Sequence, residues 1–176
     1  MNIDTAVLTN INRDHLEYHG GFEAYLHAKG RLFAQLARGE RKAGLQKTAI
    51  LPAEDPHSAY FESFAVDRAI HYGMGKGIVH AGEIDLYPDG TRLKIKVPND
   101  SIDVHLKMPG EVNVINALAA AAAALSFGIS LAAIKKGLEQ EGAIPGRLES
   151  IHVGQPFSVV VDYAHTEDSL EKLLSL

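Results

Sequence analysis

Apolar positions recur at two different spacings in the first part of the chain. Residues 5–11 form a β-branched, apolar run, which predicts a buried and parallel strand. Residues 22–36 carry apolar side chains three and four positions apart, which predicts an amphipathic helix. A second short buried strand is expected at 48–51 and a further short strand around 70–72, with a helix over 57–64 between them. Strands and helices therefore alternate here.

The middle of the chain has a period of two instead. Residues 78–86, 91–97 and 102–108 are strand-like, and the second and third runs alternate apolar with polar positions. The sequences Pro88-Asp89-Gly90 and Pro98-Asn99-Asp100, which are typical of turns, separate them. The pattern predicts a small antiparallel meander with one face in water.

Two helices are predicted to follow the meander. The first is alanine-rich, covers residues 113–127 and is stopped by Gly128. Ser130 is expected to cap the second, over residues 131–138.

The last part of the chain is predicted to form a separate set of elements. A Gly/Pro linker at 142–146 precedes two strands, at 148–153 and 157–161, and a helix from residue 166 onward. The whole pattern predicts an α/β fold, with a mostly parallel sheet flanked by helices and an antiparallel β insert. Both ends look cut from something larger, because the first strand begins near Met1 and the last helix lacks a C-cap signal.

The composition narrows the possible functions. A hydrophobic fraction of 46% in 176 residues is enough for a real core. The net charge of -5 argues against a nucleic-acid or acidic-membrane binder. Cysteine is absent, which excludes disulfides and thiolate metal sites. Neither a membrane-spanning apolar stretch nor a signal peptide is visible, so a soluble cytoplasmic protein is expected.

A charged cluster directly follows the first predicted strand. It contains Arg13, Asp14 and His15, and such residues at the carboxyl end of a parallel strand face the crevice where α/β proteins bind ligands. His15 could hold a metal, orient a phosphate or act as a base; alternatively it caps a helix beside a surface ion pair. His15 and His19 could also form the zinc pair of a metal-dependent hydrolase. The zincin motif, however, needs Glu directly after the first His, where Leu16 stands.

Lys29 lies on the apolar stripe of the first predicted helix, between Leu26 and Phe33. An unpaired ammonium there is costly. Either the stem packs while the charged end reaches water, or the amine is chemically modified or belongs to an active site.

Two further segments carry polar residues at element ends. Asn113 and Asn116 are three apart at the start of a helix, and an amide can match the hydrogen-bonding edge of adenine; alternatively, Asn113 is an ordinary N-cap. Asp162 follows a buried strand, where a carboxylate can accept bonds from ribose hydroxyls; alternatively, Asp162 or Thr166 caps a helix. The phosphate-loop pattern G-x-x-x-x-G-K-[ST] does not occur in the sequence.

Four blocks together resemble the Mur ligases, ATP-dependent amide-bond-forming enzymes of peptidoglycan synthesis. In the family's order they are TNINRDHLEYHGGFEAYLHAKGRLF, GEVNVINALAA, PGRLE and VVVDYAHTEDSLE. The resemblance covers nearly the whole chain and is weakest between about Glu40 and Asp103. The second histidine after the tyrosine favours the member that adds the third amino acid to UDP-N-acetylmuramoyl-dipeptide. The implied reaction transfers the ATP γ-phosphoryl group to the substrate carboxylate, and the amine of the amino acid then attacks the acyl phosphate.

The resemblance also implies roles for individual residues. His15 would be a ligand of the second magnesium ion. Lys29 would be carbamylated, because carbon dioxide adds to the neutral amine and gives an anion that serves that magnesium. Asn116, with Asn113 beside it, would recognise adenine, and Asp162 would hold the ribose. The other residues expected to reach or lie near the nucleotide are Arg147, Tyr163 and His165.

The same resemblance implies a division of the chain. Residues 1–145 would be a central ATPase domain without its phosphate-loop part, and 146–176 the first strands of a Rossmann-like C-terminal domain. The metal-binding glutamate and most muramoyl-dipeptide contacts would lie upstream, so the chain alone is expected to be inactive, with an exposed sheet edge that favours dimerisation. Glu167 stands where the family usually has proline. The alternative is a stand-alone, non-catalytic nucleotide-binding or scaffolding module.

Overall fold

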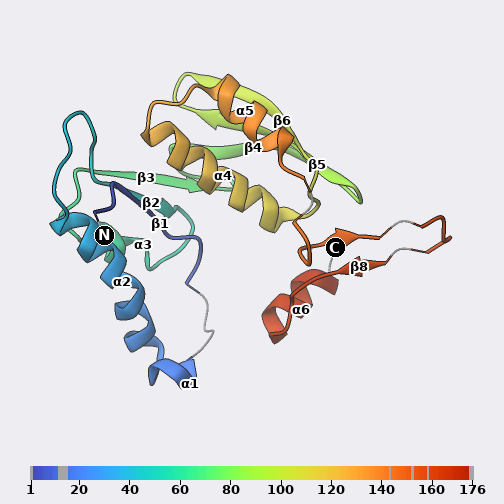
Figure 1. The fold of residues 1–176 in the computed structure, drawn as a ribbon, viewed down its shortest axis with the longest axis horizontal. Coiled ribbons are helices and arrows are strands. Elements are labelled where there is room, and N and C mark those ends of the chain that lie inside the picture. The colour runs from blue at the N-terminus through green and yellow to red at the C-terminus, as the bar shows by residue number, and fades with distance from the viewer. Residues whose placement is uncertain (1, 12–15, 143, 152, 158, 175–176) are drawn as a thin grey trace.

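A six-stranded sheet follows the order of the chain (Figure 1). The computed structural model describes residues 2–11, 16–142, 144–151, 153–157 and 159–174. Neighbouring strands are parallel from β1 to β4 and antiparallel from β4 to β6. The strands are β1 (Thr5–Val7), β2 (Thr48–Pro52), β3 (Arg68–Gly73), β4 (Val79–Tyr87), β5 (Gly90–Val97) and β6 (Asp100–Leu106). The mostly parallel sheet with an antiparallel insert is therefore confirmed.

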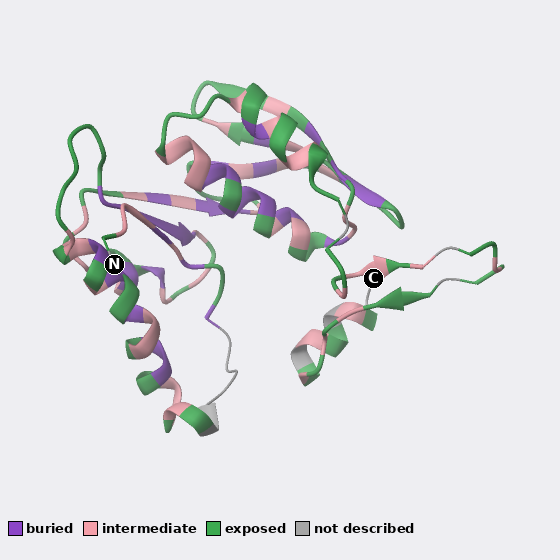
Figure 2. Ribbon diagram, in the orientation of Figure 1, coloured by how far each residue is buried: buried purple, intermediate pink, exposed green. Residues whose placement is uncertain are grey.

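Helices cover both faces of this sheet, which gives it two cores (Figure 2). On one side α4 (Glu111–Ser126) crosses the parallel strands, and α5 (Leu131–Gln140) packs beside it on β6. On the other side lie α2 (Phe22–Arg38), preceded by the single turn α1 (Leu16–His19), and α3 (Ser58–Glu62). Ile50 of β2 faces the α4 side, whereas Ala49 and Leu51 face α2 and α3. Because both faces are covered, the strand reads as a continuous apolar run.

The alanine run of α4 lets the helix approach the sheet closely. Ala117, Ala121 and Ala122 are buried together with Val114 and Leu118. The helix begins after Gly110, whose φ of 90° is open to glycine and strained for other residues.

The meander formed by β4, β5 and β6 has the predicted topology and one wet face. Leu93 and Ile95 of β5 are buried, whereas Arg92 and Lys96 on either side of them are exposed. Period-two alternation therefore identified β5 and β6 correctly.

The C-terminal part forms a hairpin and a helix of its own (Figure 1). It contains β7 (Glu149–Ser150), β8 (Val160–Val161) and α6 (Glu167–Leu174). None of its described residues from 144 onward is buried. The two strands are much shorter than the predicted ranges 148–153 and 157–161, because each pairs only with the other.

One further predicted strand is also too long. β1 ends at Val7 instead of residue 11. The Leu8 amide still donates to the Ile50 carbonyl at 2.9 Å, but the Leu8 carbonyl accepts from the Tyr72 side chain instead of a strand. In the described part of the chain, no helix has both the length and the apolar character needed to cross a membrane.

Candidate functional site

Tyr72 fixes the chain where it leaves β1. Its hydroxyl donates to the Leu8 carbonyl at 2.8 Å and lies 3.3 Å from the Thr9 carbonyl. Burial, with the nearby charges of Asp55 and Glu54, raises the pKa of Tyr72 to about 12. The tyrosine therefore stays a neutral donor and holds the segment that leads to the charged cluster.

Two carboxylates follow β2 at the same edge of the sheet. Glu54 Oε1 accepts from the Gly75 amide at 3.1 Å, and a Cβ on Gly73 would lie 1.9 Å from Glu54 Oε2. Asp55 Oδ1 accepts from the His57 amide at 2.8 Å and lies 3.0 Å from His57 Nδ1. Sequence reasoning treated this stretch as a turn and missed these residues, although two acids directly after a buried strand are a signal for this edge.

Lys29 is held on the surface of α2 rather than extended into water. Its half-buried side chain donates from Nζ to the Asn10 carbonyl at 2.8 Å, and Nζ lies 4.9 Å from the centre of the Tyr25 ring. The His19 ring lies 5.3 Å from the same Tyr25 ring. The lysine thus lies beside the segment that follows β1.

His15, Arg13 and Asp14 lie outside the described residues. The expectations that His15 is a metal ligand and pairs with His19 therefore remain predictions. Among the described residues, no group of three or more His, Asp or Glu side chains could hold a metal ion.

The two asparagines of α4 have different environments. The N-cap of α4 is Gly110, so the interpretation of Asn113 as an ordinary N-cap is wrong. Asn113 lies in the first turn of the helix, and its Nδ2 donates to the Pro109 carbonyl at 2.7 Å. Asn116 is exposed, and no described residue bonds to its amide. Asn116 is therefore the asparagine that is free to contact a ligand.

Asp162 joins the two C-terminal motifs. Its Oδ2 accepts from the Leu148 amide at 2.8 Å, and its Oδ1 accepts from the Ala164 amide at 2.7 Å. Leu148 has a φ of 47°, an uncommon conformation for a branched residue, which the carboxylate bond helps to hold. Each carboxylate oxygen keeps a second lone pair for a ligand.

Three more candidate residues gather around Asp162. The Arg147 guanidinium lies 5.0 Å from the centre of the Tyr163 ring, and the Tyr163 and His165 rings meet edge to face at 4.8 Å. All three side chains are exposed. The structure therefore brings four predicted nucleotide residues into one cluster. In the described residues, neither Lys29 nor the α4 asparagines contact it.

The capping interpretation holds for Thr166 and not for Asp162. Thr166 precedes α6, its Oγ1 accepts from the Ser169 amide at 3.3 Å, and Ser169 Oγ accepts from the Thr166 amide at 2.9 Å. This is a reciprocal N-terminal cap. Glu167 is the first helical residue, a position that proline also favours.

The fold defines an α/β domain in which the polar side chains of Glu54 and Asp55 lie beyond the carboxyl end of a parallel strand, where domains of this class bind ligands. Comparison with known proteins identifies the family. The Mur ligase middle domain matches residues 1–124. The chain belongs to this family.

Individual relatives support the same assignment. The UDP-N-acetylmuramoyl-L-alanyl-D-glutamate–2,6-diaminopimelate ligase of Geobacillus thermodenitrificans is 43% identical over 174 residues, which is 97% of this chain and 35% of that protein. The structure of MurF from Acinetobacter baumannii superposes with a TM-score of 0.83 at 33% identity, over 98% of this chain and 36% of that one. MurF from Thermotoga maritima, solved in complex with ADP, shares the fold with a TM-score of 0.80 at 18% identity, over 99% of this chain and 39% of that one. The chain thus spans about 35% of the length of the curated relatives it matches.

Proposed function

We propose that this chain supplies part of the ATP site of a ligase that adds the third amino acid to UDP-N-acetylmuramoyl-dipeptide. The observation that carries the proposal is the cluster of Arg147, Asp162, Tyr163 and His165, which joins two motifs through a hydrogen bond between residues 14 positions apart. Relatives named as diaminopimelate ligases, at 43% and 44% identity, support the third-residue ligase and diaminopimelate as the amino acid.

In this proposal, each group of residues has a separate task. Asn116 of α4 recognises adenine, with Asn113 holding the start of the helix. Asp162 holds the ribose hydroxyls, and the exposed Arg147 reaches the nucleotide. Residues 1–145 act as the central domain, and residues 146–176 begin the C-terminal domain.

Lys29 and His15 would hold magnesium. Because magnesium prefers anionic oxygen ligands, an ammonium does not serve, whereas a carbamate formed from the Lys29 amine and carbon dioxide supplies two oxygens. The Asn10 carbonyl, 2.8 Å from Lys29 Nζ, can keep a hydrogen bond to the carbamate N–H. Bound magnesium would offset the charge that builds up between two anionic reactants.

A chimeric enzyme tests the proposal. The matched segment of the Geobacillus thermodenitrificans ligase is replaced by this chain, and phosphate release is measured with ATP, UDP-N-acetylmuramoyl-dipeptide and diaminopimelate. We expect activity that requires all three substrates. A parallel chimera carrying the matched segment of the Bacillus licheniformis relative controls for the joining of segments. A folded but inactive chimera beside an active control would contradict the proposal.

Substitutions in the active chimera separate the roles. Lys29→Ala is expected to lower kcat by on the order of a hundredfold or more, because charge stabilisation is lost. Asn116→Ala is expected to raise KM for ATP by about tenfold, with a smaller effect on kcat. Lys136→Ala, at an exposed position of α5, serves as the control and should change neither constant.

A further inference from the structure

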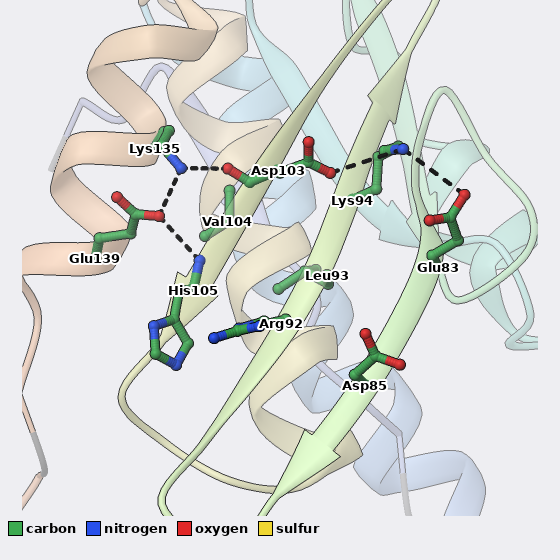
Figure 3. A pocket seen from close by; sticks show the side chains of 10 residues that line it. All are labelled: Glu83, Asp85, Arg92, Leu93, Lys94, Asp103, Val104, His105, Lys135 and Glu139. Atoms are coloured by element: carbon green, nitrogen blue, oxygen red, sulfur yellow. Dashed lines mark hydrogen bonds and ion pairs between the residues drawn. The ribbon is translucent and has the colours of Figure 1, made fainter.

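The outer side of β6 is occupied by two side chains of α5 (Figure 3). β6 is an edge strand of the main sheet. Glu139 Oε1 accepts from the His105 amide at 3.0 Å, and Lys135 Nζ donates to the Asp103 carbonyl. The two side chains also pair with each other at 2.6 Å. Lys135, and then the His105 amide, hold the pKa of Glu139 below its usual range, which keeps the carboxylate ionised.

This pair makes the two hydrogen bonds that a neighbouring strand would make. In a parallel ladder, one residue donates its N–H to the carbonyl before its partner and accepts from the N–H after its partner. Here Val104 is the partner residue on β6. The Lys135 ammonium donates to the Asp103 carbonyl, as the N–H of a neighbouring strand would. The Glu139 carboxylate accepts from the His105 N–H, as the C=O of that strand would. An i, i+4 ion pair on a helix thus closes a strand edge.

A shallow pocket lined by residues of β4, β5, β6 and α5 lies beside this pair, and several of its charged side chains are occupied with one another. Lys94 lies 3.7 Å from both Glu83 and Asp103, so the wet face of the meander forms a row of alternating charges that continues to Lys135 (Figure 3). Both lysines of this row, Lys94 and Lys135, are already paired with acids, so neither is left unpaired to attract an anion.

Without the pair, β6 would be self-complementary. In an antiparallel pair of two β6 strands centred on Val104, Asp103 of one copy lies opposite His105 of the other. The outward N–H and C=O groups of these two residues are then in register for hydrogen bonds, and an acid faces an imidazole. On the other face, Ile102 lies opposite Leu106. Such an edge is a template for association.

We propose that the Lys135–Glu139 pair closes β6 against a second copy of this chain, and that its loss lets two copies join through antiparallel β6 strands. The occupant is a second copy because the antiparallel register places the polar Asp103 opposite His105 and the apolar Ile102 opposite Leu106, so β6 is complementary to itself on both faces. This surface is independent of the proposed nucleotide site.

Sedimentation and cross-linking test the proposal. The double variant Lys135→Ala/Glu139→Ala is expected to dimerise with a dissociation constant at least about tenfold lower than that of the parent chain. Lys136→Ala/Glu141→Ala removes the same charges from exposed positions of the same helix end and should leave the constant unchanged. The chain has no cysteine, so single cysteines can report the register.

The cross-link uses two proteins in the double-variant background, one with Asp103→Cys and one with His105→Cys. Directly opposed residues in hydrogen-bonded register have Cα atoms about 5.5 Å apart, within disulfide range. We expect a mixture of the two proteins to form the 103–105 disulfide faster than either protein links to itself. A folded double variant that stays monomeric, or that links without preference for 103–105, would overturn the proposal.

Hydrogen exchange excludes unfolding of α5 as the cause. At low concentration, Glu139→Ala should speed exchange of the His105 amide and leave the α5 amides protected. At high concentration the His105 amide should become protected again. Loss of protection throughout α5, with no concentration dependence at His105, would contradict the edge-closing role.

Discussion

At the scale of single residues, Lys47 shows how a buried charge can stabilise this fold. Its side chain is 1% exposed, and its ammonium donates to Asn2 Oδ1 at 2.9 Å, to the Ile3 carbonyl at 2.6 Å and to Asp4 Oδ1 at 3.0 Å. Every proton of the ammonium therefore has an acceptor, which offsets its desolvation. Lys42 and Lys47 also hold the pKa of Asp4 below its usual range.

We expect Lys47→Met to lower the free energy of unfolding by about 3 kcal/mol, because the Asp4 carboxylate, the Ile3 carbonyl and Asn2 Oδ1 all lose the donor that they share. The Lys42 side chain pairs with the same carboxylate but is 48% exposed, so Lys42→Met should cost less than about 1 kcal/mol. Urea unfolding of the two variants measures the difference. If both variants lost the same free energy of unfolding, the burial of Lys47 would not explain its contribution to stability.

Two glycines within helices differ in how much room a methyl side chain would have. A Cβ on Gly30 of α2 would lie 2.6 Å from the Tyr60 hydroxyl, which is hydrogen-bonded to His27, whereas a Cβ on Gly137 of α5 meets nothing within 4 Å. We expect Gly30→Ala to destabilise by about 1–2 kcal/mol and Gly137→Ala to stabilise by about 0.5–1 kcal/mol. Thermal unfolding of both variants checks the opposite signs. Stabilisation by Gly30→Ala would mean that Tyr60 moves aside without cost.

At the scale of elements, the side chain of Tyr72 ties β3 to the end of β1. Because the folded-state pKa of Tyr72 is about 12 against an ordinary 10.0, the unfolded chain ionises first as the pH rises. The contribution of the neutral Tyr72 hydroxyl to the free energy of unfolding is therefore complete below pH 10 and declines between pH 10 and about 12. We expect Tyr72→Phe to remove that tyrosine's part of the alkaline decline and to lower stability at neutral pH by about 1–3 kcal/mol, because the Leu8 carbonyl loses its donor. Urea midpoints from pH 7 to 11.5 measure both effects.

The helices and strands that were predicted correctly are those marked by a pattern within their own residues. The apolar stripe of α2, the alternation in β5 and the Ser130 cap of α5 are local signals, and all three are confirmed. The length of β1 was wrong, because the Tyr72 hydroxyl takes the carbonyl that a longer strand would use. That contact joins residues 64 positions apart, so no local pattern reveals it.

For the candidate site, likewise, the sequence identified some residues but not their contacts. The motifs identified Asp162 and Asn116 as positions of interest, but their partners depend on tertiary contacts. The Leu148 amide bond to Asp162 and the internal bond of Asn113 are examples. Sequence reasoning missed the buried Lys47 and the Lys135–Glu139 pair of α5, because in the sequence these residues resemble ordinary surface charges.

At the scale of the whole molecule, the chain consists of a sheet with a core on each face and a C-terminal part in which no residue whose burial is described is buried. Exposed apolar side chains concentrate in the latter, among them Val153, Phe157 and Tyr163 with 83%, 65% and 64% exposure. The two cores draw all of their buried residues from positions up to Ile134. Residues 146–176 therefore contribute little burial to the sheet, which fits the proposed division at 145.

Removing residues 146–176 tests that division. Because no described residue of this part is buried, we expect the shortened chain to keep its free energy of unfolding within about 0.5 kcal/mol, close to the usual effect of surface changes. Urea unfolding followed by far-ultraviolet circular dichroism measures this quantity, and hydrogen exchange of the β2 and β3 amides should be the same in both chains. A loss of more than about 2 kcal/mol would show that both parts unfold as one cooperative unit. The proposed boundary would then be wrong, and the Asp162 cluster would have to be considered part of the central domain.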